Sequence, residues 1–283
     1  EQISAAILGD LRAKMREHLA ARAPAGVEVR VDRAVITVPA YFDAPQIEAT
    51  RRAGELAGLE VLGVLHEPTA AAIHHQWKRQ TTGGTFLVYD LGGGTFDVSV
   101  IRLEHGEHQV LAIDGDNFLG GDDLDRRFAE RLRQMLVQRG AALDLDPLGR
   151  PDDAERWQRL VHAAQEIKEA LSTQPVVSFA REGLLVDRAG QQVSIDVELA
   201  RADWDDAVRS LVDVTLEACE RALEKSRAAA GVGIDDVDHV ILVGGSTRSP
   251  AIVARVTEAL AARTRGKEVW QSDVDTCVAL GAA

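Results

Sequence analysis

The segment at residues 90–97, DLGGGTFD, places three consecutive glycines and a threonine between two acidic residues. Glycines let a backbone turn sharply and bring its N–H groups close to an oxyanion, because no Cβ stands in the way. Asp90 could hold a hydrated Mg²⁺ ion, and the Thr95 hydroxyl could reach a terminal phosphate. A plain glycine-rich turn is the alternative, but the flanking acids and the threonine favour a phosphate-binding hairpin.

Three further loops share this logic, since each follows a predicted strand and carries small or acidic residues. Glu67 stands at a helix start, where the helix dipole favours a carboxylate that could orient a metal-bound or attacking water. Gly120 and Gly121 present N–H groups at another helix start, which suits a phosphate. The loop 244–248 allows close backbone approach, and its Arg248 could stack on a purine. Taken singly, each loop is also explained by an ordinary turn or helix start.

Hydrophobic periodicity and turn residues predict the elements that would position these loops. Strands are predicted at residues 34–38, 61–65, 85–89, 98–103, 108–113, 175–180, 192–197 and 239–243. Helices are predicted at residues 3–21, 43–58, 66–77, 119–138, 154–171, 201–230 and 250–263. Strand and helix alternate at both ends of the chain, which indicates an α/β fold, and the middle section has an α+β pattern.

Composition excludes several classes of protein. The chain has 283 residues, of which 46% are hydrophobic, enough for about two domains or one large two-lobed domain. Its net charge of −13 argues against a surface that binds nucleic acid or anionic membranes, although backbone N–H groups and Mg²⁺ could still hold a nucleotide. No membrane span or export signal is visible, which predicts a cytoplasmic location. Cys219 and Cys277 are too few for a disulfide framework or a cysteine metal site.

Five segments in order closely resemble the ATPase domain of the heat shock protein 70 family of DnaK-type chaperones. They are ITVPAYFD (36–43), LHEPTAAAI (65–73), DLGGGTFDV (90–98), LGGDD (119–123) and VGGSTR (243–248). The resemblance covers nearly the whole chain and is more specific than any one motif. It implies an actin-like, ribonuclease-H-like fold with two lobes around a cleft that binds ATP or ADP with Mg²⁺.

The resemblance also implies a domain organisation and roles for single residues. Residues 1–79 would form an incomplete lobe I, residues 80–119 and 208–283 the base of lobe II, and residues 120–207 its α+β subdomain. Glu67 and Asp90 would act near Mg²⁺ and its waters, Thr95 near the γ-phosphate, and Asp97 at the cleft floor. Phosphates would contact Gly92, Gly93, Gly94, Gly120 and Gly121; ribose and adenine would contact Lys168 and Ser172; and Gly244, Gly245, Ser246, Arg248 and Asp275 would complete the adenosine pocket. A solvated helix face is the alternative for Lys168 and Ser172.

The function implied for the complete protein is ATP hydrolysis coupled to client-protein folding. A J-domain co-chaperone and a nucleotide-exchange factor are the implied partners, and client peptides would bind through a domain outside this chain. The family's first phosphate hairpin and the lysine that follows it are missing, so we expect a chain truncated at both ends that hydrolyses ATP poorly. Gln165, Glu169 and Ile47 replace a glutamate and two arginines usual in the family, which puts adenine affinity and interdomain coupling in question.

Two other functions remain open from the sequence. Sugar kinases use similar phosphate hairpins, so a small-molecule kinase of the same superfold is one alternative. The other is a degenerate, non-enzymatic interaction module that binds a nucleotide-exchange factor through residues 120–207.

Overall fold

The structure is organised around a five-stranded mixed sheet with the strand order β5-β4-β3-β8-β9. Its strands are β3 (Gly84–Leu91), β4 (Phe96–Glu104), β5 (Glu107–Asp116), β8 (His239–Val243) and β9 (Val269–Gln271). The neighbours β3, β4 and β5 are antiparallel, whereas β3, β8 and β9 are parallel. This computed structural model describes residues 1–265, 268–271 and 273–283. It confirms the predicted mixed α/β class.

Both faces of this sheet are buried, as the near-continuous hydrophobic runs of its central strands require. Along β3, Leu87 and Tyr89 belong to one hydrophobic cluster, and Phe86 and Val88 belong to another. Successive side chains of a strand point to opposite faces, so the two clusters lie on opposite sides of the sheet. The larger cluster continues into the helices that lead to the candidate site.

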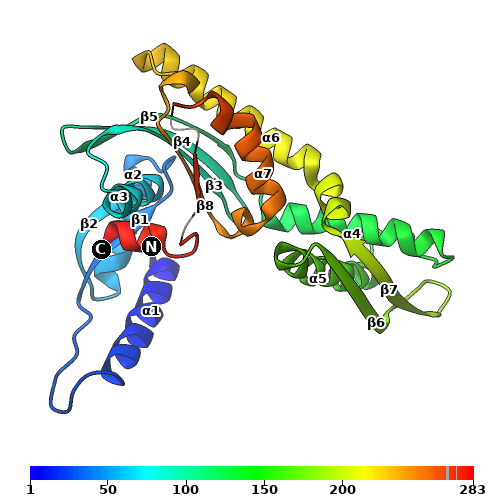
Figure 1. Cartoon of the computed structure of the whole chain (residues 1–283). Coiled ribbons are helices and arrows are strands. Elements are labelled where there is room, and N and C mark those ends of the chain that lie inside the picture. Colours follow the sequence, from blue (N-terminus) through cyan, green and yellow to red (C-terminus); the bar gives the residue numbers. More distant parts are fainter. Residues whose placement is uncertain (266–267, 272) are drawn as a thin grey trace.

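One group of elements lies beside the sheet, at the left of Figure 1. It consists of α1 (Gln2–Ala20), β1 (Arg33–Val38), α2 (Ala44–Leu56), β2 (Glu60–His66), α3 (Glu67–Arg79) and α8 (Cys277–Ala282). Strands β1 and β2 pair in parallel, and α3 packs against α8 and the sheet. Asp43 caps α2 by accepting the N–H of Gln46, at the predicted helix start.

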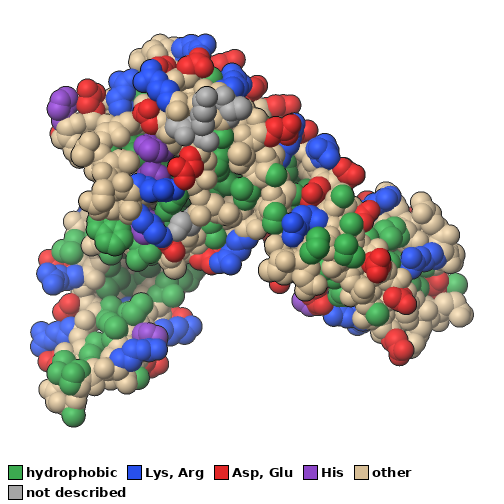
Figure 2. All heavy atoms as spheres, viewed as in Figure 1, with side chains coloured by type: hydrophobic (Ala, Val, Ile, Leu, Met, Phe, Trp, Pro, Cys, Tyr) green, Lys and Arg blue, Asp and Glu red, His purple; other side chains and the backbone are tan. Residues whose placement is uncertain are grey.

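Helix α1 has no buried residue. One row of large apolar side chains recurs at every fourth position, and each member of the row is exposed: Ile3, Ile7, Leu11, Met15 and Leu19. Figure 2 shows apolar side chains at the surface in this part of the molecule. Among the described residues, no helix is both long and apolar enough to cross a membrane.

A second group of helices and a hairpin extends from the other side of the sheet (Figure 1). It consists of α4 (Gly121–Gln138), α5 (Pro151–Thr173), β6 (Val176–Val186), β7 (Gln192–Ala200), α6 (Arg201–Ala230) and α7 (Pro250–Leu260). Helix α6 packs against β4 and β5 and also against α4, so it joins this group to the sheet. The molecule is therefore arched in outline, as Figure 2 shows.

The structure differs from the sequence prediction mainly at the ends of elements. The predicted helix 250–263 is α-helical only to Leu260, and a 3₁₀ turn follows at Ala261–Arg263. Helix α5 begins at Pro151, inside the predicted connector 140–153, because proline fits the first helical turn. Strand β9 and helix α8 were not predicted; each is too short to show a repeating hydrophobic pattern.

Candidate functional site

The tip of the β3–β4 hairpin is contacted by two loops from distant parts of the chain. At the start of α4, the N–H groups of Gly121 and Asp122 donate to the carbonyl oxygens of Gly92 and Gly93, at 2.9 and 2.8 Å. After β8, the Ser246 hydroxyl donates to the same Gly92 oxygen at 2.9 Å. Three of the four loops singled out in the sequence therefore meet at one place.

The pairing of β3 with β8 explains this convergence. The two strands are parallel, and Asp90 is the register partner of Val243, so their carboxyl ends coincide. The loops that follow parallel strands meet at that edge of a sheet, where α/β proteins commonly bind ligands. Gly244, with φ of +86°, passes so near β3 that a Cβ would lie 2.4 Å from the Leu91 carbonyl oxygen.

Two of the predicted phosphate-binding glycines are closely packed. A Cβ at Gly120 would lie 2.4 Å from the Gly93 carbonyl oxygen, and one at Gly121 would lie 2.6 Å from the Ser246 hydroxyl. The N–H of Gly120 donates to Asp123, and the N–H of Gly121 donates to the hairpin. These glycines therefore fix the position of α4 against the hairpin, and their contact with phosphate stays a prediction.

The glycines at the tip of the hairpin are open. A Cβ at Gly93 or Gly94 would have no neighbour within 4 Å, and the same holds for Gly245. Within the described residues, the N–H groups of Gly93 and Gly94 donate no hydrogen bond. Two unpaired amides in open space are suited to bind the oxygens of an anionic ligand.

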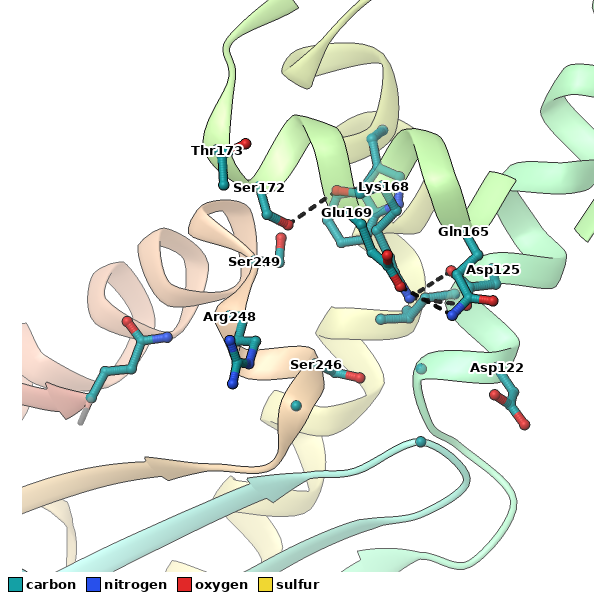
Figure 3. A pocket seen from close by; sticks show the side chains of 16 residues that line it. Asp122, Asp125, Gln165, Lys168, Glu169, Ser172, Thr173, Ser246, Arg248 and Ser249 are labelled. Carbon is teal, nitrogen blue, oxygen red and sulfur yellow. Dashed lines mark hydrogen bonds and ion pairs between the residues drawn. The ribbon is translucent and has the colours of Figure 1, made fainter. Parts of the chain in front are cut away.

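A cavity of about 770 Å³ lies beside these loops, a volume within the range of ligand sites. Its walls come from the start of α4, from α5 and from the segment after β8 (Figure 3). The predicted binding residues that line it are Gly93, Gly121, Lys168, Ser172, Gly245, Ser246 and Arg248. Predicted binding residues that lie as far apart in the sequence as Gly93 and Arg248 therefore line the same cavity.

Lys168 is held by a buried partner that the sequence analysis missed. Its Nζ atom lies 2.7 and 2.9 Å from the two carboxylate oxygens of Asp125, which is only 5% exposed. Burial raises the pKa of Asp125, and Lys168 opposes that rise. Asp125 could have been recognised from the sequence as a candidate site residue, because it lies one helical turn after Gly121 and therefore on the same face of α4. Ser172 donates its hydroxyl to the Lys168 carbonyl oxygen at 3.0 Å.

Arg248 and Asp275, both predicted for the adenosine pocket, form an ion pair. Their side chains are about half exposed, at 58% and 54%. The pair brings residues 273–276 to the edge of the cavity, where Arg248 and Gln271 also line a neighbouring hollow.

The predicted catalytic carboxylates form an acidic cluster of their own and do not line the cavity. Asp90 and Asp97 are directly opposite each other on β3 and β4. Burial, with smaller contributions from the Glu67 and Asp97 charges, raises the pKa of Asp90 to about 7. Burial and the Asp97 charge likewise raise the pKa of Glu67. Burial also raises the pKa of Asp97, against the effect of a hydrogen bond from Thr95.

Tyr41 lies near this cluster, although the sequence analysis gave it no role. Its pKa is raised by burial and then by the charges of Asp97 and Glu67. Tyr41 could have been recognised as a candidate site residue because it belongs to ITVPAYFD, one of the five segments that carry the family resemblance.

The acidic cluster has the chemistry of a magnesium site. Repulsion between Asp90, Glu67 and Asp97 would be relieved by a divalent cation, and carboxylates are among its preferred ligands. In the described residues, no three His, Cys, Asp or Glu side chains are placed to ligate one ion directly. A hydrated Mg²⁺ ion fits, because such ions commonly use one or two carboxylates and keep several waters.

The sequence of this chain is similar to known proteins over its whole length. The family model described as Hsp70 protein matches residues 1–283. A chaperone protein DnaK of Mycoplasmopsis pulmonis (strain UAB CTIP) is 42% identical over 284 residues, covering 100% of this chain and 43% of the relative. That of Mycoplasmopsis agalactiae (strain NCTC 10123 / CIP 59.7 / PG2) is 38% identical over 283 residues, covering 100% and 44%. The chain thus spans less than half the length of these relatives, and it belongs to the Hsp70 protein family.

Proposed function

We propose that this chain binds ATP and ADP with Mg²⁺ as part of the ATPase domain of a DnaK-type chaperone. The observation that carries the proposal is the meeting of three loops at Gly92, with the free amides of Gly93 and Gly94 beside a cavity of about 770 Å³. Membership of the Hsp70 family supports a nucleotide as the occupant.

The proposed nucleotide would extend along the cavity from the hairpin to α5. Its phosphates would lie at the turn formed by Gly92, Gly93 and Gly94, where the free amides of Gly93 and Gly94 and the open space beside them suit oxyanions. Its nucleoside would lie among the residues of α5 and of the segment after β8. Those residues are Lys168, Ser172, Gly244, Gly245, Ser246, Arg248 and Asp275.

The acidic cluster is proposed to serve the hydrolysis step. Asp90 and Glu67 would hold a hydrated Mg²⁺, which would neutralise charge on the phosphates. Thr95, at the hairpin turn, would contact the terminal phosphate, and Asp97 would support Asp90 from the neighbouring strand. The raised pKa of Glu67 suits it to orient a water and accept its proton.

The two-lobed, actin-like arrangement is the fold that goes with this function. Residues 1–79 would belong to lobe I, residues 80–119 and 208–283 to the base of lobe II, and residues 120–207 to its α+β subdomain. The packing of α6 against both the sheet and α4 supports a subdomain attached to that base.

The activity of the whole protein is also a proposal, because the relatives are more than twice as long as this chain. It would couple ATP hydrolysis to client-protein folding in the cytoplasm. A J-domain co-chaperone and a nucleotide-exchange factor would be its partners.

Calorimetric titration of the chain with ADP and ATP in the presence of Mg²⁺ tests the proposal. We expect saturable heat with each nucleotide at a ratio of one per chain. Absence of heat with both would favour the interaction module. Binding of ATP that is strengthened by a sugar, with transfer of the γ-phosphate to it, would favour the small-molecule kinase, a function that the family match does not support.

A further inference from the structure

The carboxylate of Asp273 joins helix α3 to the segment that follows β9. Its Oδ2 atom lies 2.5 Å from Lys78 Nζ and 3.2 Å from His74 Nε2, and both partners belong to α3. An ionised carboxylate only accepts hydrogen bonds, so His74 donates its Nε2–H to it. His74 is 4% exposed, and its ring lies against those of Trp77 and Trp270. Packing therefore holds this donor in place.

Asp273 also shapes the turn that leads into α8. Its carbonyl oxygen accepts the N–H groups of Thr276 and Cys277, both at 2.7 Å. Its φ is +54°, in the left-handed region, which aspartate tolerates better than most residues. The course of residues 273–276 therefore depends on Asp273, whose side chain is held at the same time by α3.

The same turn is tied to Arg248, which lines the cavity on the segment after β8 (Figure 3). Asp275, two residues after Asp273, forms the ion pair with Arg248. Gln271, at the end of β9, donates its side-chain amide to the carbonyl oxygen of Thr247. The loop that carries Arg248 is therefore held at two points by the chain that follows β8 and α7.

Helix α3 connects this junction with the acidic cluster. Glu67 is the first residue of the helix, and His74 and Lys78 follow it by seven and eleven positions, so the three lie on one face. About 10 Å of helix separates Glu67 from His74, at 1.5 Å per residue. A predicted catalytic carboxylate and the predicted nucleoside contact Arg248 are thus joined through one helix and one aspartate.

We propose that His74 and Lys78 are positioning residues of the nucleotide site, which hold Arg248 against the nucleoside through Asp273 and the turn 273–276. This inference rests on the proposed function, because it assumes that a nucleoside contacts Arg248. Neither His74 nor Lys78 is among the described residues that line the cavity. They act by restricting where Asp275 and Arg248 lie before the ligand binds, which reduces the cost of ordering these side chains.

The test measures ADP affinity by calorimetry in the presence of Mg²⁺ for His74→Phe, His74→Gln and Lys78→Ala. Phenylalanine keeps an aromatic ring without a donor, whereas glutamine keeps an N–H donor. The matched control is Arg79→Ala, because Arg79 follows Lys78 on α3 and pairs with Glu268, which precedes β9. We expect His74→Phe and Lys78→Ala to weaken binding by roughly threefold, within the usual coupling between residues of one network. His74→Gln and Arg79→Ala should bind ADP as the wild type does.

A double-mutant cycle separates positioning from a general effect on packing. His74→Phe and Lys78→Ala are each combined with Arg248→Ala, in which there is no guanidinium to position. The combined variants should then bind ADP with the affinity of Arg248→Ala alone, because the single effects act through Arg248.

The possible outcomes separate this inference from the function on which it rests. The inference is overturned if His74→Phe and Lys78→Ala bind ADP as the wild type does, or if their losses persist in full beside Arg248→Ala. It is also overturned if Arg79→Ala loses as much affinity as Lys78→Ala. In each of these cases the nucleotide function stands, whereas a wild type that binds no ADP overturns both proposals. The Lys78 side chain is 41% exposed, so Lys78→Ala carries the test if His74→Phe does not fold.

Discussion

The backbone N–H of Gly121 donates to the carbonyl oxygen of Gly92 at 2.9 Å, which fastens the start of α4 to the turn of the β3–β4 hairpin. The Ser246 hydroxyl shares that acceptor. The turn is therefore held from two sides through its carbonyl groups, while the N–H groups of Gly93 and Gly94 remain available to a ligand. This division of the turn into an anchored and an open side underlies the first prediction.

Alanine at Gly120 should destabilise the fold, whereas alanine at Gly94 should not. A methyl group at Gly120 would lie 2.4 Å from the Gly93 carbonyl oxygen, whereas one at Gly94 would meet nothing within 4 Å. We expect Gly120→Ala to lower the free energy of unfolding by about 1–3 kcal/mol, as overpacked substitutions do. Gly94→Ala should keep the wild-type value in urea titrations but bind ADP more weakly. Equal stability of the two variants would contradict the close packing of α4 on the hairpin.

Replacing Asp90 by Asn should stabilise the chain at alkaline pH when no divalent cation is present. The pKa of Asp90 rises in the folded state from 3.8 to about 7, so the wild type loses stability as pH rises through that interval. At pH above 7, Asp90→Asn should unfold with a free energy higher by as much as about 4 kcal/mol, from about three pKa units. Below pH 4 the two proteins should be equally stable. Urea titrations across this pH range in a chelating buffer give the measurement. If the free energies of unfolding of the two proteins change in parallel with pH, the pKa of Asp90 is not raised in the folded state.

Replacing His75 by Phe should remove a loss of stability in acid. The ring of His75 lies among aromatic rings, with centroids 4.7 Å from His239 and 4.9 Å from Trp270, and its Nδ1 atom has no partner. Burial and then neighbouring positive groups lower its pKa from 6.5 to about 4. Its contribution to stability is therefore complete above pH 6.5 and is lost as pH falls through 4.

The size of that loss is up to about 3 kcal/mol, from roughly 2.5 pKa units. The free energy of unfolding of His75→Phe should depend less on pH over this interval than that of the wild type. Substitution of the exposed His18 by Gln is the control and should leave the wild-type profile unchanged. If the free energy of unfolding of His75→Phe falls as steeply in acid as that of the wild type, groups other than His75 cause the loss of stability.

Arg248→Ala should weaken ADP binding and leave the fold intact. Arg248 pairs with Asp275 in a half-exposed position, and exposed ion pairs contribute about 0–1 kcal/mol to stability. Removing the guanidinium takes away a group that can stack on the base. The matched control is Arg209→Ala on α6, which breaks a similar exposed pair with Asp206 away from the cavity. Unchanged ADP affinity in Arg248→Ala would remove Arg248 from the nucleoside site.

The longer elements that position the site could be predicted because each has a hydrophobic pattern typical of a helix or a strand. Helix α6 and strand β8 have the predicted bounds, since a long amphipathic helix and a short β-branched strand carry clear patterns. Strand β9 and helix α8 have three and six residues, too few for a period to be visible. Their positions depend on pairing with β8 and packing against α3.

The loops of the site could be predicted from the sequence. Which of their glycines pack against another loop and which stay open to a ligand could not be predicted. Gly94 and Gly120 have the same predicted role as phosphate contacts, and only the three-dimensional structure shows that Gly94 is open and Gly120 is closely packed. The pairing of Lys168 with Asp125 escaped prediction for a related reason, because it joins α5 to α4 across 43 positions. Contacts of this kind depend on how helices pack and leave no local pattern.

The most direct test of the central claim, that the β3–β4 turn binds nucleotide phosphates, is the amide spectrum of ¹⁵N-labelled protein titrated with ADP and Mg²⁺. We predict that the resonances of Gly93 and Gly94 shift in saturable fashion, because their free N–H groups would bind phosphate oxygens. Gly26 and Gly190, in turns outside the cavity, should not shift. Unchanged Gly93 and Gly94 resonances at ADP concentrations that saturate the calorimetric signal would contradict the claim.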